Sequence, residues 1–162
     1  MTLKKIGFGG GCHWCTEAYF QALKGVEKVE QGWISATFPN DGFSEAVIIH
    51  YDSKIISVEV LTSIHLHTHA STKNHSFREK YRSAVYVFHN EIEAVQKIIN
   101  EIQNDFEEAI ITKPLLFKEF KLNSEDQQNY YRKNKEGAFC ERYILPKLKK
   151  IESEYANYFK QI

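Results

Sequence analysis

The sequence predicts an α+β fold, a two-layer sandwich in which helices cover a mixed, mostly antiparallel sheet. Stretches in which apolar and polar residues alternate, as in strands, are interspersed with stretches of helical periodicity. The order of these stretches suits helices packed on a sheet. A length of 162 residues suits one domain. We therefore expect residues 1–162 to form a single domain with a ferredoxin-like core.

The N-terminal third opens with a strand over residues 4–9, whose last residue is the first of three consecutive glycines, 9–11. After the glycines, apolar residues from Trp14 to Leu23 recur at helical spacing, and Gly25 is placed to end that helix. A second strand is expected over residues 26–34. The predicted order is therefore a strand, a flexible glycine turn and a helix that begins directly after the turn.

The clearest strand of the sequence covers residues 44–51, after a turn-rich loop at 37–42. Glu45 opens the apolar face of this strand. A carboxylate at a strand end is often simply solvated. If Glu45 faces the core, burial keeps it protonated, as a proton donor requires.

The middle of the chain predicts a helix after Ser57, which is a plausible N-cap, and a strand over residues 82–88. Apolar residues at helical spacing predict a long amphipathic helix over residues 92–106. Two short strand-like runs are expected within 110–121, separated by Pro114.

The C-terminal part begins with a predicted polar helix over residues 123–131. Cys140 is expected in a loop introduced by Gly137. Residues 143–162 are charged and aromatic and are predicted to be mostly helical.

Composition narrows the function class. Lys plus Arg and Asp plus Glu both number 21, so the formal net charge is zero, and nothing indicates a nucleic-acid partner or an anionic membrane surface. No apolar run approaches a membrane span. Three cysteines are too few for a secreted disulfide scaffold and suit a reducing compartment. The N-terminus leads directly into the first strand, leaving no room for a signal peptide. We expect a monomer in the cytoplasm, with no membrane and no nucleic-acid partner.

Cys12 is the candidate nucleophile. It stands where the glycine turn meets the helix, and unpaired N–H groups at a helix start stabilise an anion. Such positions and Cys-x-x-Cys pairs lower the pKa of a thiol, and it is the thiolate that reacts. Cys15 lies one helical turn further on, where it can pair with Cys12 or merely pack.

Several motifs together resemble those of the peptide methionine sulfoxide reductase A family. Residues 11–14, Gly-Cys-His-Trp, with Glu17, resemble its signature Gly-Cys-Phe-Trp-Gly-x-Glu. Residues 44–52 resemble its His-Ala-Glu-Ala-Val…Tyr-Asp-Pro strand, and residues 80–86 its Gln-Tyr-Arg-Ser-Ala-Ile-Tyr strand. Residues 127–140 resemble the region that carries a recycling cysteine. These matches follow the family's order and cover about residues 5–140.

The resemblance implies an oxidoreductase that reduces methionine-S-sulfoxide, free or in proteins. In that reading the Cys12 thiolate attacks the sulfoxide sulfur, Glu45 protonates the oxygen and Tyr81 holds it. Trp14 packs against the substrate methyl group. Cys12 remains as a sulfenic acid, which condenses with a second thiol. No cofactor is implied beyond an external thiol reductant, thioredoxin. This mechanism requires the Cys12 and Glu45 side chains to face the same cavity.

The chain departs from the family pattern at several positions. His13 replaces a Phe and places a polar ring in the substrate pocket. Trp33 stands where a second oxygen-binding Tyr is usual, and Ser76 where an Asp is usual. Two thiols can resolve the sulfenic acid: Cys140, favoured because it matches by position, and Cys15, which replaces a Gly.

Two other functions remain open alongside this one. The first is a thioredoxin-like thiol–disulfide oxidoreductase built on Cys12 and Cys15, although only eleven residues precede the pair and no proline is placed as such folds require. The second is a zinc-binding module that uses these cysteines with histidines of the 65–75 segment. The preceding helical periodicity argues that those histidines cap or surround a helix end. A domain that keeps the fold without catalysis is disfavoured by the presence of Cys12, Glu45 and Tyr81. The candidate site residues are therefore Cys12, His13, Trp14, Cys15, Trp33, Glu45, Tyr81 and Cys140.

Overall fold

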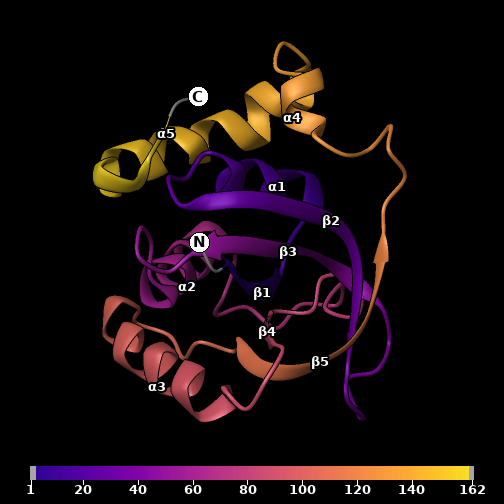
Figure 1. Ribbon diagram of the computed structural model, residues 1–162, viewed down its shortest axis with the longest axis vertical. Helices are drawn as coiled ribbons and strands as arrows, with labels where there is room; N and C mark the ends of the chain where they lie inside the picture. The colour runs from indigo at the N-terminus through magenta and orange to yellow at the C-terminus, as the bar shows by residue number, and fades with distance from the viewer. Residues whose placement is uncertain (1–2, 161–162) are drawn as a thin grey trace.

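Five strands close into a barrel in the order β1-β3-β2-β5-β4 in the computed structural model, which describes residues 3–160 (Figure 1). The strands are β1 (Leu3–Gly9), β2 (Val26–Ala36), β3 (Ser44–Asp52), β4 (Ala84–Val87) and β5 (Lys113–Leu122). All neighbouring pairs are antiparallel except β4 and β5, which are parallel. The α+β class and the mixed, mostly antiparallel sheet are confirmed. The two-layer sandwich is wrong, because the parallel β4–β5 pair joins the ends of the sheet.

Helices surround this barrel on more than one side. They are α1 (His13–Gln21), α2 (Val58–Thr68), α3 (Ile92–Ile102), α4 (Tyr130–Lys133) and α5 (Leu145–Glu154). Figure 1 shows α1, α4 and α5 together at one end of the molecule and α3 at the other. Short 3₁₀ turns follow α3 and α5, at Gln103–Asp105 and Ala156–Tyr158, and a π-helical turn, Cys140–Ile144, leads into α5.

Both faces of the strands are buried. Inside the barrel a small cluster includes Ile34, Ile48 and Tyr86, and the larger cluster lies between the outer face and the helices. The barrel interior is crowded at Gly7, where a Cβ atom would lie 2.9 Å from Tyr86 Cβ and 3.1 Å from Ile34 Cδ1. A glycine at this position therefore lets β1 pass close to its neighbours.

The predicted elements of the first half agree with the structure, apart from the role of Gly25. The Ser57 hydroxyl accepts a hydrogen bond from Val60 N–H at 3.2 Å, so Ser57 is the N-cap of α2 as expected. Helix α1 ends at Gln21, and Gly25, with a φ of 92°, instead makes the turn into β2.

Three expectations for the second half are wrong. Pro114 does not separate two strands: it is the second residue of β5, opposite Val85 of β4. The predicted helix over 123–131 is mostly turns, and only α4 is helical. Cys140 is not in a loop, because it begins the π-helical turn and lies in the core.

Candidate active site

Cys12 lies at the junction between β1 and α1. Gly10 makes the preceding turn with a φ of 146°, a conformation that favours glycine, and a side chain there would overlap the His69 ring. Cys12 is the N-cap residue of α1, and its carbonyl accepts both the N–H and the hydroxyl of Thr16, at 3.1 Å each. The thiol is half-buried. The predicted position at a helix start is therefore confirmed.

The surroundings of Cys12 favour its thiolate. The pKa of Cys12 is lowered, first because the Cys15 thiol donates a hydrogen bond to its sulfur. Backbone N–H groups of Trp14 and Cys15 add to this effect, whereas burial and the charge of Glu45 oppose it. These N–H groups belong to the first turn of α1, which has no intrahelical partner for them. Cys12 therefore has the electronic character of a nucleophile.

Cys15 is the partner thiol of this pair. Its hydrogen bond to Cys12 and its burial raise the pKa of Cys15, so it remains a thiol while Cys12 ionises. Both cysteines line a cavity of about 220 Å³, together with Tyr19, His69 and Lys147. The sequence left pairing and packing open for Cys15, and the contact between the two sulfurs favours pairing.

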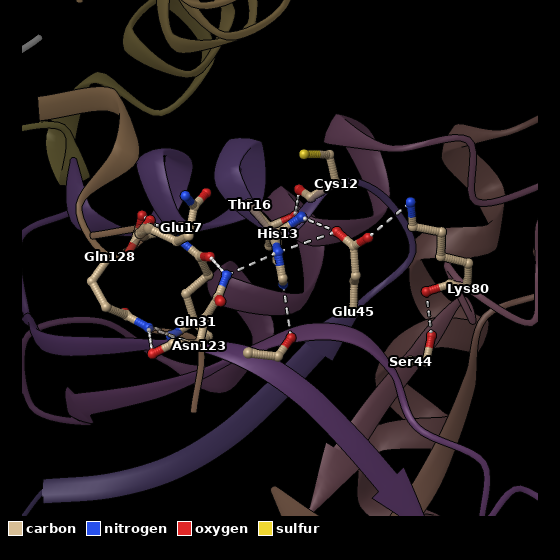
Figure 2. A network of polar contacts seen from close by, with 12 residues as sticks. Cys12, His13, Thr16, Glu17, Gln31, Ser44, Glu45, Lys80, Asn123 and Gln128 are labelled. Carbon is tan, nitrogen blue, oxygen red and sulfur yellow. Dashed lines mark hydrogen bonds and ion pairs between the residues drawn. The ribbon is translucent and has the colours of Figure 1, made fainter. Parts of the chain in front are cut away.

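Glu45 is buried beside the first turn of α1, with 7% of its surface exposed. It is the second residue of β3, and its Oε1 accepts the backbone N–H of His13 at 3.1 Å. The His13 Nε2 lies 3.4 Å from the same oxygen, and Lys80 Nζ lies 3.5 Å from Oε2 (Figure 2). Glu45 is thus held next to Cys12 by the peptide group that follows the cysteine.

The Cys12 sulfur and the Glu45 carboxyl are directed differently in this structure. Figure 2 shows the sulfur directed away from the carboxyl. The cavity that Cys12 lines with Cys15 does not include Glu45. The two side chains therefore lie on either side of the start of α1. The expectation that Cys12 and Glu45 face one shared cavity is wrong for this structure, because the Cys12 sulfur is directed toward Cys15 and away from the carboxyl.

Tyr81 and Glu45 are both close to the side chain of Lys80. The Lys80 ammonium lies 5.1 Å from the centre of the Tyr81 ring. The pKa of Lys80 is raised, first by its hydrogen bond with Tyr81 and then by the charge of Glu45. Sequence reasoning missed Lys80, although a basic residue directly before the candidate tyrosine was a usable signal.

The aromatic candidates fall into two groups. Trp33 lies opposite Glu45 in the β2–β3 pair, and its ring centre is 5.2 Å from that of His13. Trp14 instead stacks on Tyr130, with ring centres 3.9 Å apart, and meets Phe139 edge-on. Trp33 and His13 therefore lie together beside the Glu45 carboxyl. Trp14 packs α1 against residues 129–139, the segment around α4.

Glu17 of the signature fixes that segment to α1. Its carboxylate is buried and accepts the backbone N–H groups of Asn129 and Tyr130, at 3.0 and 3.1 Å. It also accepts the Gln31 side-chain amide at 2.9 Å. This part of the site was not assigned a role from the sequence.

Cys140 is fully buried in the core, and burial raises its pKa. It begins the π-helical turn, near Tyr130, whose own pKa is raised first by burial and then by the charges of Cys140, Cys12 and Cys15. The structure therefore brings Cys15 into contact with Cys12 and keeps Cys140 behind the aromatic residues of the segment around α4.

The histidines of the proposed zinc module point to different partners. His67 on α2 contacts Asp105 at 3.3 Å, and the Nε2 of His69 contacts the Ser83 hydroxyl at 2.8 Å. Burial lowers the pKa of His69 to about 4 and that of His65 well below its usual value. Over residues 3–160, no three His, Cys, Asp or Glu side chains are grouped as metal ligands would be. In that same range, no helix is long and apolar enough to cross a membrane.

The chain is similar to known proteins over nearly its whole length. The family model described as peptide methionine sulfoxide reductase matches residues 4–159. A relative from Pasteurella multocida, named peptide methionine sulfoxide reductase MsrA, is 33% identical over 99% of this chain and its own full length. Among solved structures, Mxr1 from Saccharomyces cerevisiae in reduced form has a TM-score of 0.72 at 25% identity, covering 85% of this chain and 89% of Mxr1. Mxr1 in complex with Trx2 has a TM-score of 0.62 at 21% identity, covering 79% and 84%, and supports the fold alone.

Proposed function

The chain belongs to the peptide methionine sulfoxide reductase family, and we propose that Cys12, Glu45 and Tyr81 perform its reaction. The enzyme is an oxidoreductase that reduces methionine sulfoxide to methionine. We infer that the substrate is the S epimer, free or within a protein, as the family resemblance implies. The observation that carries the assignment is Cys12 at the start of α1, stabilised as a thiolate and separated from an acid by one peptide group.

The first step is attack of the Cys12 thiolate on the sulfoxide sulfur. Glu45 protonates the oxygen, because an unprotonated sulfoxide oxygen is a poor leaving group. Tyr81 orients that oxygen with its hydroxyl, next to the Lys80 ammonium. This step requires the Cys12 side chain to turn about its Cα–Cβ bond, away from Cys15, so that the sulfur reaches the carboxyl side.

The substrate methyl group is held by the walls of the site. Trp33 and His13 lie beside Glu45, so they contact the substrate most directly. Trp14 borders the same helix turn, and its stacking on Tyr130 fixes the orientation of its ring. Its indole N–H is buried without a hydrogen-bond partner among the described residues.

The second step resolves the sulfenic acid at Cys12. Its sulfur has lost two electrons to the substrate sulfur and carries a hydroxyl group. We assign the resolving role to Cys15, because its thiol already contacts the Cys12 sulfur, whereas Cys140 is buried in the core. The Cys15 thiol displaces the hydroxyl group as water, and a disulfide joins residues 12 and 15.

Mass spectrometry of the protein after one turnover distinguishes the two resolving thiols. A disulfide-linked peptide that contains residues 12 and 15 is expected. A link between residues 12 and 140 would contradict the assignment and require the π-helical turn to open, since Cys140 has no exposed surface.

A dithiol reductant completes the cycle, and thioredoxin is the partner that recycles the enzyme. The resemblance implies this, and Mxr1 with Trx2 provides a structural precedent within the same fold. We also propose that the protein acts as a monomer in the cytoplasm; its three free thiols suit a reducing compartment. We also assign the first four strands to a ferredoxin-like core, supported by their order β4-β1-β3-β2, within one catalytic domain over residues 1–162.

Reduction of a racemic methionine sulfoxide peptide with dithiothreitol tests the proposed function. The wild type should consume the S epimer and leave the R epimer, as chiral analysis of the remaining peptide would show. Cys12→Ser should consume neither, while Cys140→Ser should behave as the wild type with this small reductant. Consumption of sulfoxide by Cys12→Ser would remove Cys12 from the mechanism.

A further inference from the structure

A second cavity, of about 530 Å³, shares no lining residue with the cavity around Cys12. Its walls come from the β2–β3 loop, the loop before β4, helix α3 and the start of β5 (Figure 1). Small-molecule sites in proteins have volumes of about 300–1,000 Å³. The cavity therefore has the size of a ligand site, and the reaction proposed above uses none of it.

The charged residues that line this cavity are all basic. Arg78, Arg82 and Lys113 line it, and no lining residue is Asp or Glu. The ion pairs found within residues 3–160 involve other side chains, so none of these three cations is paired with a carboxylate there. Burial lowers the pKa of Arg78, because its charge has lost part of its contact with water. Charges that lose water usually have a partner of opposite sign, so this lining attracts an anion.

The two guanidinium groups are held in place and still have N–H groups to offer. Arg82 donates to the Tyr86 hydroxyl at 2.9 Å and to two backbone carbonyl oxygens, at 2.9 and 3.2 Å. Arg78 donates to four backbone carbonyl oxygens. A guanidinium has five N–H groups, so these contacts leave two on Arg82 and one on Arg78. Because the side chains are already anchored, little conformational entropy is lost when they bind a ligand.

Lys113 and two amide side chains add further donors. Lys113 is exposed at the start of β5, and Asn40 and Asn74 also line the cavity. An ammonium group offers three N–H groups and an amide two. Guanidinium groups bind phosphate oxygens in pairs, and three cations match a dianion better than the single charge of a carboxylate. The donor set therefore favours a phosphate group.

Part of the lining is apolar. Ile110, Ile111 and Leu115 line the cavity, and each of them is half-buried. An inorganic phosphate ion leaves this surface in contact with water, whereas a phosphate ester with an apolar group covers it. The combination of cations and apolar side chains therefore favours a small phosphate monoester over free phosphate.

We propose that this cavity binds a small phosphate monoester, with the phosphate against the three cations and the apolar group against the isoleucines and Leu115. The site is separate from that of methionine sulfoxide, and the proposal does not rest on the proposed function. Arg78 connects the two regions, because its Nη1 donates to the carbonyl oxygens of Gly10 at 3.0 Å and Tyr81 at 2.9 Å. A substitution of Arg78 would disturb the turn before Cys12, so the test uses Lys113 instead.

The test is a titration of the reduced wild-type protein with phenyl phosphate, followed by ¹⁵N NMR. The Nε–H of Arg82 and the backbone N–H groups of Thr112 and Lys113 should shift and saturate. Lys113→Glu should weaken binding by about fivefold or more, because it replaces an attraction by a repulsion. Lys118→Glu is the matched control, since Lys118 is exposed on the same strand and does not line the cavity, and it should change the affinity by less than about twofold. Equal weakening by the two variants overturns the proposal, as does the absence of saturable shifts at the cavity.

A comparison of three probes identifies the chemistry of the ligand. Phenyl phosphate should bind most tightly, and inorganic phosphate about tenfold more weakly, because it buries no apolar area. Benzoate should bind most weakly, since it carries a single charge. Benzoate binding as tightly as phenyl phosphate overturns the phosphate assignment, and inorganic phosphate binding as tightly overturns the apolar contact. The titrations contain no sulfoxide, so a failure of the proposed function leaves their outcome unchanged.

Discussion

Replacing Cys15 by Ala should make Cys12 a weaker nucleophile at neutral pH. The substitution removes the donor that is the largest cause of the lowered pKa of Cys12 and leaves the helix N–H groups in place. A hydrogen bond to a charged group contributes about 1.5–3 kcal/mol. Cys12 is only half-buried, so we take the lower end, about 1.5 kcal/mol. That free energy corresponds to a rise of about one pH unit in the pKa of Cys12.

The assay is the rate of alkylation of Cys12 by iodoacetamide as a function of pH, with modification at residue 12 quantified by mass spectrometry. The midpoint should rise by about one pH unit in Cys15→Ala and by less in Cys15→Ser, whose hydroxyl still donates. Cys140→Ser is the control and should match the wild type, because the Cys140 side chain is not among the groups that shift Cys12. Equal midpoints in Cys15→Ala and the wild type would refute the assigned role of the Cys15 thiol.

Three further substitutions test the site and the barrel. Glu45→Gln should slow methionine formation in a single turnover by about 10²–10⁴-fold, because it removes the proton donor, and an unchanged rate would exclude Glu45 as the acid. Ser57→Ala should lower the free energy of unfolding by about 1 kcal/mol in urea titrations, since it removes the N-cap of α2, whereas the exposed Ser53→Ala should not. Gly7→Ala should lower it by about 1–3 kcal/mol through overlap with Tyr86, and Gly42→Ala, which meets open space, is the matched control; equal effects of the two would contradict the crowded barrel interior.

The local elements around Cys12 could be predicted because their signals are local. Alternation in β1, the glycine turn and the helical spacing of α1 all lie within about twenty residues. The same holds for Ser57, whose side chain bonds three residues ahead. Short-range sequence patterns are sufficient for elements of this kind.

Barrel closure could not be predicted because it depends on pairing between β4 and β5, which lie far apart in the sequence. Pro114 argued for a break, yet it sits near the start of β5, where a strand tolerates a missing N–H donor. The burial of Cys140 was missed for a related reason. Gly137 indicated a loop, and only the packing of the following turn into the core decides otherwise.

The sequence predicted which residues form the candidate site, but not the side-chain contacts between them. Cys12, Glu45 and Tyr81 were predicted from their motifs, and the structure buries Glu45 beside the first turn of α1. The contacts of Lys80 with Glu45 and of His13 with Gly32 join residues distant in the chain, so no local pattern contains them. The direction of the Cys12 sulfur depends on a single side-chain torsion angle, which a sequence motif does not specify.

The central claim is that Cys12 takes the oxygen from the substrate. Its most direct measurement uses the Cys15→Ser, Cys140→Ser double variant, in which neither second thiol can resolve the sulfenic acid. After reaction with methionine-S-sulfoxide and then dimedone, methionine should form in equal amount to the enzyme, and mass spectrometry should find dimedone on residue 12. Methionine formed without modification of residue 12, or dimedone on another residue, would contradict the account.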